Sequence, residues 1–201
     1  MFKGKKTMLR SYEKKDITLV NKWFSDLDIK YLLSPGQISP MNSQSGEQFV
    51  EKCINNKDRD NSQTFAIESD KGIYIGGCGY FKVNPRNSTC YIHIAIGDPD
   101  YQNKGYGTDA LKTLCNYLFN EVNIRKIQLE VLAYNMRAIR CYEKLGFKHE
   151  GRRCEQIYRN GKYYDECLLA LFKKEFKYHY DFVSIDQELV NSVTSTNDYS
   201  R

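Results

Sequence analysis

The sequence lacks a long hydrophobic run. Its 201 residues contain no stretch that approaches the roughly 18 apolar residues of a membrane-spanning helix. The segment from Met1 to Arg10 carries four basic residues, but no apolar stretch of signal-peptide length follows it. Dense runs of Lys and Arg, which are typical of nucleic-acid-binding segments, are also absent. We therefore expect a cytoplasmic protein that binds neither a membrane nor a nucleic acid.

Closely spaced cysteine pairs are absent as well. The seven cysteines are scattered without a Cys-x-x-Cys pair, and their odd number does not suggest a disulfide framework. The three histidines, His93, His149 and His179, do not fall at metal-ligand spacings relative to the cysteines. We expect reduced, mostly buried thiols, and neither a metal site nor a cysteine nucleophile.

The composition that remains is typical of a globular protein with a hydrophobic core. Hydrophobic residues make up 41% of the chain and charged residues 27%, and the length fits one domain. We expect this domain to cover residues 1–176, followed by a tail over residues 177–201 that is frayed or holds a short helix at most. The net charge of +5 fits either a phosphate-rich ligand or simple solubility.

The first part of the chain shows one strand pattern and two helix patterns. A short strand is expected over residues 7–12, and Asp16 is the expected N-cap of the following helix. The apolar face of that helix is formed by Ile17, Val20, Phe24 and Leu27. Ser45 and Gln48 have the spacing of a capping box, which predicts the start of a second helix there.

The rest of the chain first shows strand patterns only, and then helix and strand patterns in alternation. Three runs rich in β-branched and aromatic residues predict an antiparallel meander, and helical and extended periods alternate after Gly97. Asn160 and Gly161 suit the tight turn of a hairpin. The expected strands are 64–68, 73–83, 89–96, 126–132, 147–158 and 163–172, and the expected helices are 107–118 and 138–145.

Two glycines lie where a strand is followed by a helix. The segment Gln102-Asn103-Lys104-Gly105-Tyr106-Gly107 comes after the strand that ends near Ile96 and precedes a helix that begins around Thr108. The first N–H groups of a helix lack intrahelical partners and favour a bound anion, and glycines let the backbone approach phosphate oxygens closely. Taken alone, the glycines also fit a purely structural turn. No Gly-Lys-Ser/Thr follows, as a Walker loop requires, and the third glycine of a dinucleotide-binding turn is missing.

Together with a second segment, this turn resembles a known family. Gln-x-x-Gly-x-Gly between a strand and a helix is similar to the coenzyme A pyrophosphate-binding motif of GNAT acetyltransferases, and residues 135–147 resemble the helix and strand that close their cofactor site. The element order over residues 7–176 also resembles the GNAT fold. The resemblance implies an α/β (α+β) fold with a mixed, mostly antiparallel sheet of about seven strands and about four flanking helices. It is greatest to the branch of ribosomal-protein N-terminal acetyltransferases and spermidine acetyltransferases.

The resemblance implies an N-acetyltransferase that uses acetyl-CoA as cosubstrate, needs no metal, and transfers the acetyl group in a ternary complex to a primary amine of a small molecule or a peptide. Without it, Asn135 would be interpreted as a helix N-cap and Tyr142 as a core aromatic. With it, Tyr142 protonates the departing thiolate, for which a phenol with a pKa of about 10 is suited. The cofactor-binding residues that the resemblance implies are Ile94, Ala95 and Ile96 (through their backbone), Gln102, Asn103, Lys104, Gly105, Tyr106, Gly107, Thr108, Asn135, Ala138 and Tyr142.

The general base is where the sequence departs from the family. Relatives in this branch often carry glutamate at the position of Tyr91 and glycine at that of His93. His93, with an ordinary pKa of about 6.5, is the expected catalytic base, although a strand histidine is as often structural; Glu68 and Asp98 remain as bases that act through water. Neutralising an α-amine of pKa about 7.8 at pH 7 requires roughly 1 kcal/mol, against about 4–5 kcal/mol for an alkyl amine of pKa about 10.4. The missing glutamate and the positive net charge therefore weakly favour a protein N-terminal α-amine over a polyamine.

Two alternative functions remain open at this point. A non-catalytic acyl-CoA-binding module keeps the fold but does not need an acid at Tyr142, and a nucleotide- or RNA-binding domain would use the basic turn. A homodimer is compatible with the resemblance, and the tail after Phe176 offers an exchangeable segment. We expect the acceptor pocket to be formed mainly by residues 23–40 and by the hairpin at residues 158–165.

Overall fold

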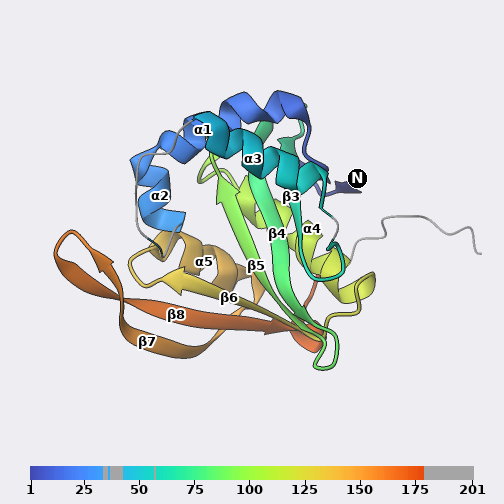
Figure 1. Ribbon diagram of the computed structural model, residues 1–201. Helices are drawn as coiled ribbons and strands as arrows, with labels where there is room; N and C mark the ends of the chain where they lie inside the picture. The colour runs from blue at the N-terminus through green and yellow to red at the C-terminus, as the bar shows by residue number, and fades with distance from the viewer. Residues whose placement is uncertain (34–35, 37–42, 57, 179–201) are drawn as a thin grey trace, which may run out of the picture.

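The chain folds into one sheet with helices on both of its faces. The computed structural model describes residues 1–33, 36, 43–56 and 58–178. These residues form five α-helices and a single eight-stranded sheet (Figure 1). The strands are β1 (Phe2–Lys3), β2 (Thr7–Arg10), β3 (Gln63–Ser69), β4 (Tyr74–Asn84), β5 (Thr89–Ile96), β6 (Lys126–Leu132), β7 (Lys148–Arg159) and β8 (Lys162–Phe172). The helices are α1 (Ile17–Ser25), α2 (Leu27–Leu33), α3 (Ser43–Ile54), α4 (Tyr106–Asn120) and α5 (Met136–Leu145).

The sheet is mixed and mostly antiparallel, as predicted. Its strand order is β1-β2-β3-β4-β5-β6-β8-β7, and the pair formed by β5 and β6 is parallel. The meander of β3, β4 and β5 lies within one residue of the predicted starts and ends, and β6 has the predicted bounds. The sheet has one strand more than expected because β1 pairs with β2, with Phe2 opposite Leu9.

The helical layer differs from the prediction at the end of α1. This helix ends at Ser25, and Asp26 adopts an extended conformation directly after it. The Asp26 carboxylate accepts hydrogen bonds from the amides of Asp28 and Ile29, which starts a separate helix, α2. Leu27 therefore belongs to α2 and is 52% exposed, so its predicted place on the apolar face of α1 is wrong.

The two predicted helix caps also differ from the structure. Asp16 precedes α1 as predicted, but its carboxylate receives two hydrogen bonds of 2.9 Å from the Arg10 guanidinium and caps no helical amide. The capping box at Ser45 is wrong, because α3 already begins at Ser43. The amide of Gly46 instead donates to the side-chain oxygen of Asn21 in α1, at 3.0 Å. Asp16 thus holds the predicted N-cap position without a side-chain cap, because Arg10 binds its carboxylate, whereas in α3 a tertiary partner, Asn21, takes the place of the predicted capping box.

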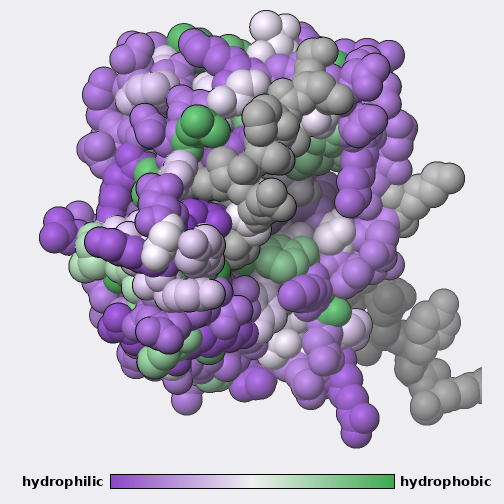
Figure 2. Space-filling model, turned by 60° about the vertical axis from the view of Figure 1, so that its left-hand side comes forward, coloured by the Kyte–Doolittle hydropathy of each residue, from purple (hydrophilic) through white to green (hydrophobic). Residues whose placement is uncertain are grey.

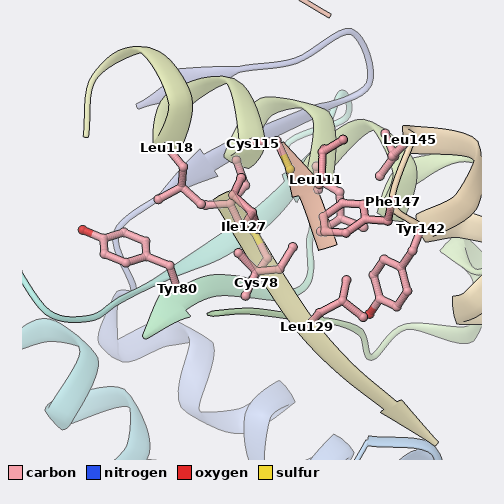
Figure 3. Close-up of a cluster of buried hydrophobic side chains, with 14 of the residues drawn as sticks. Cys78, Tyr80, Leu111, Cys115, Leu118, Ile127, Leu129, Tyr142, Leu145 and Phe147 are labelled. Carbon is pink, nitrogen blue, oxygen red and sulfur yellow. The ribbon is translucent and has the colours of Figure 1, made fainter. Parts of the chain in front are cut away.

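Two hydrophobic clusters lie on opposite faces of the sheet. The larger one packs α4 and α5 against one face, and its labelled members gather between α4 and the strands in Figure 3. The smaller one packs α1 and α3 against the other face, where Ala66 and Tyr74 meet Val20, Trp23 and Val50. All seven cysteines are free thiols, and four of them are buried.

The chain ends, within the described part, in a long hairpin. Asn160 and Gly161 both have positive φ angles, of 48° and 78°, as the predicted tight turn between β7 and β8 requires. The ladder is irregular between Arg153 and Ile157, and this irregularity sets which residues of the two strands face one another. The predicted tail lies outside the described residues from residue 179 on. No helix in the described ranges has the length and apolar character needed to cross a membrane.

Candidate active site

The strands β5 and β6 are paired over only part of their length. Their parallel ladder has three residue pairs and ends at Tyr91 and Gln128, after which the strands diverge (Figure 1). A cleft of about 900 Å³ occupies the space between them. Beyond Tyr91, the edge of β5 that faces β6 has no strand partner, so every second residue directs its backbone N–H and C=O groups into the cleft.

The turn after β5 leads into α4 with its amides unpaired. Gly105 is the N-cap residue of α4 and has φ 87°, a left-handed conformation that glycine adopts without strain. The amides of Tyr106, Gly107 and Thr108 have no hydrogen-bond partner among the residues that the structure describes. Three free donors at the positive end of a helix dipole form a site for an anion.

Gln102 holds this turn against its surroundings. Its side-chain Nε2 donates to the carbonyl oxygen of Ile96 in β5 at 2.9 Å, and its Oε1 accepts from the guanidinium of Arg137 in α5. The Gln102 side chain thus connects three of the elements that surround the cleft, and this connection fixes the turn relative to β5 and α5.

Most of the predicted site residues line the cleft. They are His93, Ile94, Ala95, Ile96, Gln102, Asn103, Gly105, Gly107, Thr108, Asn135, Ala138 and Tyr142. Lys104 and Tyr106 are not part of the lining. Lys104 is exposed, and its backbone carbonyl accepts from Lys6 Nζ at 3.0 Å. The Tyr106 hydroxyl donates to Asp70 at 3.3 Å, so this side chain belongs to the outer surface of the turn.

Asp109, which no motif indicated, anchors the start of α4. Its buried carboxylate accepts from the amides of Lys5, Lys6 and Thr7 at 2.8–3.1 Å and from the Thr7 hydroxyl at 2.9 Å. A side chain at Gly4 would collide with it, because an added Cβ would lie 2.4 Å from its Oδ2 atom. The segment between β1 and β2 therefore fixes the position of the helix that carries the free amides.

Asn135 is the N-cap of α5 and also a link to α2. Its Oδ1 accepts from the amide of Ala138 at 3.2 Å, and its Nδ2 donates to the carbonyl of Leu32 at 3.2 Å. The neighbouring Tyr134 hydroxyl donates to the carbonyl of Tyr31 at 2.7 Å. These bonds hold α2 beside the N-terminus of α5, so that both helices contribute to the cleft.

Tyr142 combines a buried ring with a free hydroxyl. The residue is 8% exposed, and its ring packs edge-on against Phe147 with ring centres 5.8 Å apart. Figure 3 shows its hydroxyl oxygen directed away from α5. This hydroxyl makes no hydrogen bond to any described residue, and burial raises the pKa of Tyr142 above its ordinary value. The phenol is therefore protonated at neutral pH and able to donate.

His93 lies on the face of β5 opposite to the α4 side, together with Tyr91. Both rings lie near Phe81, with ring centres 5.9 Å and 5.7 Å from it. The imidazole opens to the solvent of the cleft, but the surrounding strands and rings displace much of its hydration, and this burial lowers the pKa of His93 to about 4. With this pKa the ring is neutral at pH 7.

The two other candidate bases lie away from the cleft lining. Glu68 in β3 accepts a hydrogen bond of 2.7 Å from Arg10 and forms part of a largely buried ion-pair network with Asp16. Asp98 accepts from the amide of Asp100 and caps a short 3₁₀ helix. Neither residue is among those that line the cleft, so both have structural roles instead.

The charges of the cleft are separated into two ends. The basic end is formed by α5, which contributes all the Lys and Arg residues among the described lining residues: Arg137, Arg140 and Lys144. The acidic end is formed by Asp26, which lies between α1 and α2, and by α2, β6 and β8, which contribute Asp28, Glu130 and Glu166. The face that carries α2 and the hairpin tip is largely hydrophilic, with small separate hydrophobic patches (Figure 2).

Only some of the residues predicted for the acceptor pocket line the cleft. Asp26, Asp28, Ile29 and Leu32 come from the expected region, of which residues 34–35 and 37–40 lie outside the described residues. The hairpin residues 158–165 contribute nothing to the described lining. Glu130 and Glu166 were missed, because a single glutamate in a strand carries no motif.

A family model matches most of the chain. Residues 6–148 match the model of the acetyltransferase (GNAT) domain, from just before β2 to the start of β7. The matched range contains the turn after β5, the whole of α4 and α5, and both strands that diverge around the cleft.

Individual relatives agree with this match. The chain is 27% identical to the SPbeta prophage-derived uncharacterized N-acetyltransferase YokL of Bacillus subtilis (strain 168), over 87% of this chain and 94% of that protein. It is 30% identical to the spermidine N(1)-acetyltransferase of Vibrio cholerae, over 63% of this chain and 73% of that protein. The crystal structure of spermidine N-acetyltransferase from Vibrio cholerae in complex with CoA and spermine has a TM-score of 0.72 at 23% identity, over 84% of this chain and 96% of that chain.

Proposed function

The chain belongs to the GNAT acetyltransferase family, and from this premise we propose that it transfers the acetyl group of acetyl-CoA directly to a primary amine of a small cationic acceptor. The observation that carries the proposal is the separation of charge in one continuous cleft. Its basic end, with the free amides of α4, fits the phosphates of coenzyme A, and its acidic end fits an ammonium group. The two substrates would meet where β5 and β6 diverge.

The basic end offers the donors that a pyrophosphate needs. The free amides of Tyr106, Gly107 and Thr108 would bind its oxygens, with Arg137 supplying positive charge beside them. A Cβ added at Gly107 would lie in ordinary contact with Ile96 and Ile94, at 3.5 Å and 3.8 Å, so this residue packs against β5 beside the free amides. Tyr106 would contribute through its backbone alone, since its hydroxyl binds Asp70 outside the cleft, and Lys104 is not among the lining residues.

The unpaired edge of β5 would hold the rest of the cosubstrate. Backbone groups at Ile94, Ala95 and Ile96 face the cleft in alternation, which suits an extended chain that carries amide groups of its own. Acetyl-CoA supplies an activated thioester, and a backbone N–H aimed at its carbonyl oxygen stabilises the charge that develops there during attack. A main-chain donor serves this role whatever the side chain is.

In the reaction the amine nitrogen bonds to the acetyl carbon, the carbon–sulfur bond breaks, and the sulfur takes up a proton. Tyr142 would supply that proton, which its raised pKa and free hydroxyl support. The amine must lose a proton first. His93 is neutral and able to accept a hydrogen bond from it, but an imidazole of pKa about 4 is a weak base for an alkyl ammonium. Its assignment as the base stays a prediction.

A small polycationic acceptor is favoured over a protein N-terminus. The acidic end carries four carboxylates, whereas a peptide N-terminus offers a single positive charge. The spermidine acetyltransferase relative acts on a small polyamine, as its name states, and aligns with the chain at 30% identity. The net positive charge of the chain is no argument against a cation, because the local charge of the acidic end is negative.

The test is release of free coenzyme A thiol with acetyl-CoA and a panel of amines: spermidine, an aminoglycoside, an amino sugar and a peptide with a free N-terminus. We expect thiol release with a polycationic amine and little with the peptide. Failure to bind acetyl-CoA in a calorimeter would contradict the proposal. Binding of acetyl-CoA without thiol release from any amine would favour the acyl-CoA-binding module.

A further inference from the structure

Three charged side chains from three neighbouring strands meet at the acidic end of the cleft. Arg153 in β7 donates through Nη1 to Glu130 in β6 at 3.0 Å and to Glu166 in β8 at 2.7 Å. The ladder explains the meeting, because Arg153 lies opposite Glu166, and Glu166 lies opposite Leu132, two residues from Glu130. All three side chains therefore project from the same face of the sheet.

Only the carboxylates of this group line the cleft. Glu130 and Glu166, which we call the carboxylate pair, belong to the lining, while Arg153 lies behind them and does not. The side chain of Glu166 is 5% exposed, so bulk water does little to screen it. Two carboxylates and one guanidinium leave one net negative charge on this wall. The basic lining residues all belong to α5, at the other end of the cleft, and do not neutralise it.

The carboxylate pair lies close to the place where the strands diverge. The last residue pair between β5 and β6 is Tyr91 with Gln128. His93 follows Tyr91 by two residues, and Glu130 follows Gln128 by two residues. Both therefore lie on the same face of the sheet as that pair, one on either side of the opening. An acceptor that reaches the opening from this face passes the carboxylate pair.

A carboxylate that pairs with the reacting nitrogen without accepting its proton would be counterproductive. It would stabilise the ammonium form and raise the pKa of the amine, which must be neutral to attack the thioester. A carboxylate that binds a second ammonium of the same molecule positions the acceptor and leaves the reacting amine free to lose its proton. The single net charge of the wall suits one such ammonium.

We propose that Glu130 and Glu166, held in place by Arg153, are specificity residues that bind a second, non-reacting ammonium group of the acceptor. The inference rests on the proposed function and adds that the acceptor carries at least two amines. Arg153 acts through the carboxylate pair, because its guanidinium donates to one oxygen of each carboxylate and lowers the negative charge that the acceptor meets. The contact with the acceptor is made by carboxylate oxygens.

The experiment compares 1,4-diaminobutane with butylamine, which has the same chain length and lacks the second amine. Wild type should have a kcat/KM at least tenfold higher for the diamine. Glu130→Gln should lower kcat/KM for the diamine about tenfold, as expected for loss of a hydrogen bond to a charged group. It should keep kcat/KM for butylamine within twofold of wild type. Arg153→Gln should have the opposite sign, because it frees both carboxylates, and should raise kcat/KM for the diamine about threefold.

Arg152→Gln is the matched control. Arg152 directly precedes Arg153 in β7 and forms an ion pair with Asp165 in β8, yet neither Arg152 nor Asp165 lies in the cleft lining. Arg152→Gln should keep kcat/KM for both amines within twofold of wild type. All variants should bind acetyl-CoA with the affinity of wild type. Equal turnover of the two amines by wild type, or an equal loss for both amines in Glu130→Gln, would overturn the inference while leaving acetyl transfer intact. Absence of thiol release with every amine would overturn the proposed function itself.

Discussion

The basic and acidic ends of the cleft are built in different ways. The basic end comes from two short continuous segments, 102–108 and 135–144, and its main donors are backbone amides at the start of α4. The acidic end comes from residues far apart in the sequence, such as Asp28, Glu130 and Glu166, which α2 and the strands bring together. One end depends on local backbone conformation, and the other depends on tertiary placement of side chains.

This difference has a consequence for substitution. A backbone donor survives a change of side chain provided that the turn keeps its conformation, as Tyr106 illustrates, whose side chain binds Asp70 outside the cleft. A carboxylate at the acidic end acts through its side chain, so a change of that side chain removes its charge. We therefore expect the basic end to respond to changes in conformation and the acidic end to respond to changes in charge.

The largest effect is expected between the two ends, at Tyr142. Tyr142→Phe removes the proton donor and should lower kcat about 100-fold, within the range for loss of a general acid. Steady-state thiol release measures kcat, and calorimetry should show acetyl-CoA affinity within twofold of wild type. Tyr106→Phe is the control, because its hydroxyl binds Asp70 outside the cleft, and it should retain full activity. A Tyr142→Phe enzyme with wild-type kcat would refute the acid role.

The next effect is on stability, at the anchor of the basic end. Asp109→Asn replaces one acceptor oxygen by an NH₂ group that faces the donors of Lys5, Lys6 and Thr7. The free energy of unfolding should fall by about 2–3 kcal/mol, because buried charged hydrogen bonds are lost. Urea denaturation measures this change. Asp100→Asn, at an exposed position, should stay within about 0.5 kcal/mol of wild type, and an equal loss in both would contradict the anchoring role.

A smaller effect tests the backbone conformation of the basic end. Gly105→Ala forces a side chain into a left-handed conformation at φ 87° and should weaken acetyl-CoA binding roughly tenfold by distorting the turn. Gly72→Ala is the control, since Gly72 has φ 73° in a turn away from the cleft, with no atoms near an added Cβ. Both variants should lose about 1 kcal/mol of stability, and Gly105→Ala alone should lose affinity in calorimetry. Unchanged affinity in Gly105→Ala would argue against a backbone cradle.

The smallest effect concerns His93 and pH. Its pKa is about 4 in the folded protein against an ordinary value of 6.5, so between these values the unfolded chain binds more protons. The stability that the neutral ring contributes is present above pH 6.5 and is lost as pH falls towards 4. His93→Gln should therefore show a smaller fall in unfolding free energy between about pH 7 and pH 5 than wild type, measured in urea. Identical slopes would show that the pKa is not lowered.

The parts of the fold that local chemistry encodes could be predicted from the sequence. The start of α4 depends on Gly105, and the hairpin turn depends on Asn160 and Gly161, whose left-handed conformations are accessible to these residue types. The strands of the meander could also be predicted, from their runs of β-branched and aromatic residues. Asp16 is the N-cap residue of α1 as predicted, although its carboxylate binds Arg10 and no helical amide, and the capping box at Ser45 failed because Asn21 accepts from the amide of Gly46.

The place of Arg153 beside Glu130 and Glu166 could not be predicted, for a reason that lies in the hairpin. The turn at residues 160–161 alone would place Arg153 opposite Leu168. The irregularity between Arg153 and Ile157, where Glu155 has φ 51°, shifts the register so that Arg153 lies opposite Glu166. No residue in this stretch is a glycine that would signal the shift, so its position depends on packing of the whole sheet.

The most direct test of the two-ended cleft is a crystal structure with a bisubstrate analogue, in which a diamine is joined to coenzyme A through an acetyl linker. The account predicts that the pyrophosphate lies on the amides of Gly107 and Thr108, that the linker passes between β5 and β6, and that the distal ammonium contacts Glu130 or Glu166. An analogue whose diamine and coenzyme A both lie on the α5 side of the sheet, with the carboxylate pair untouched, would contradict it.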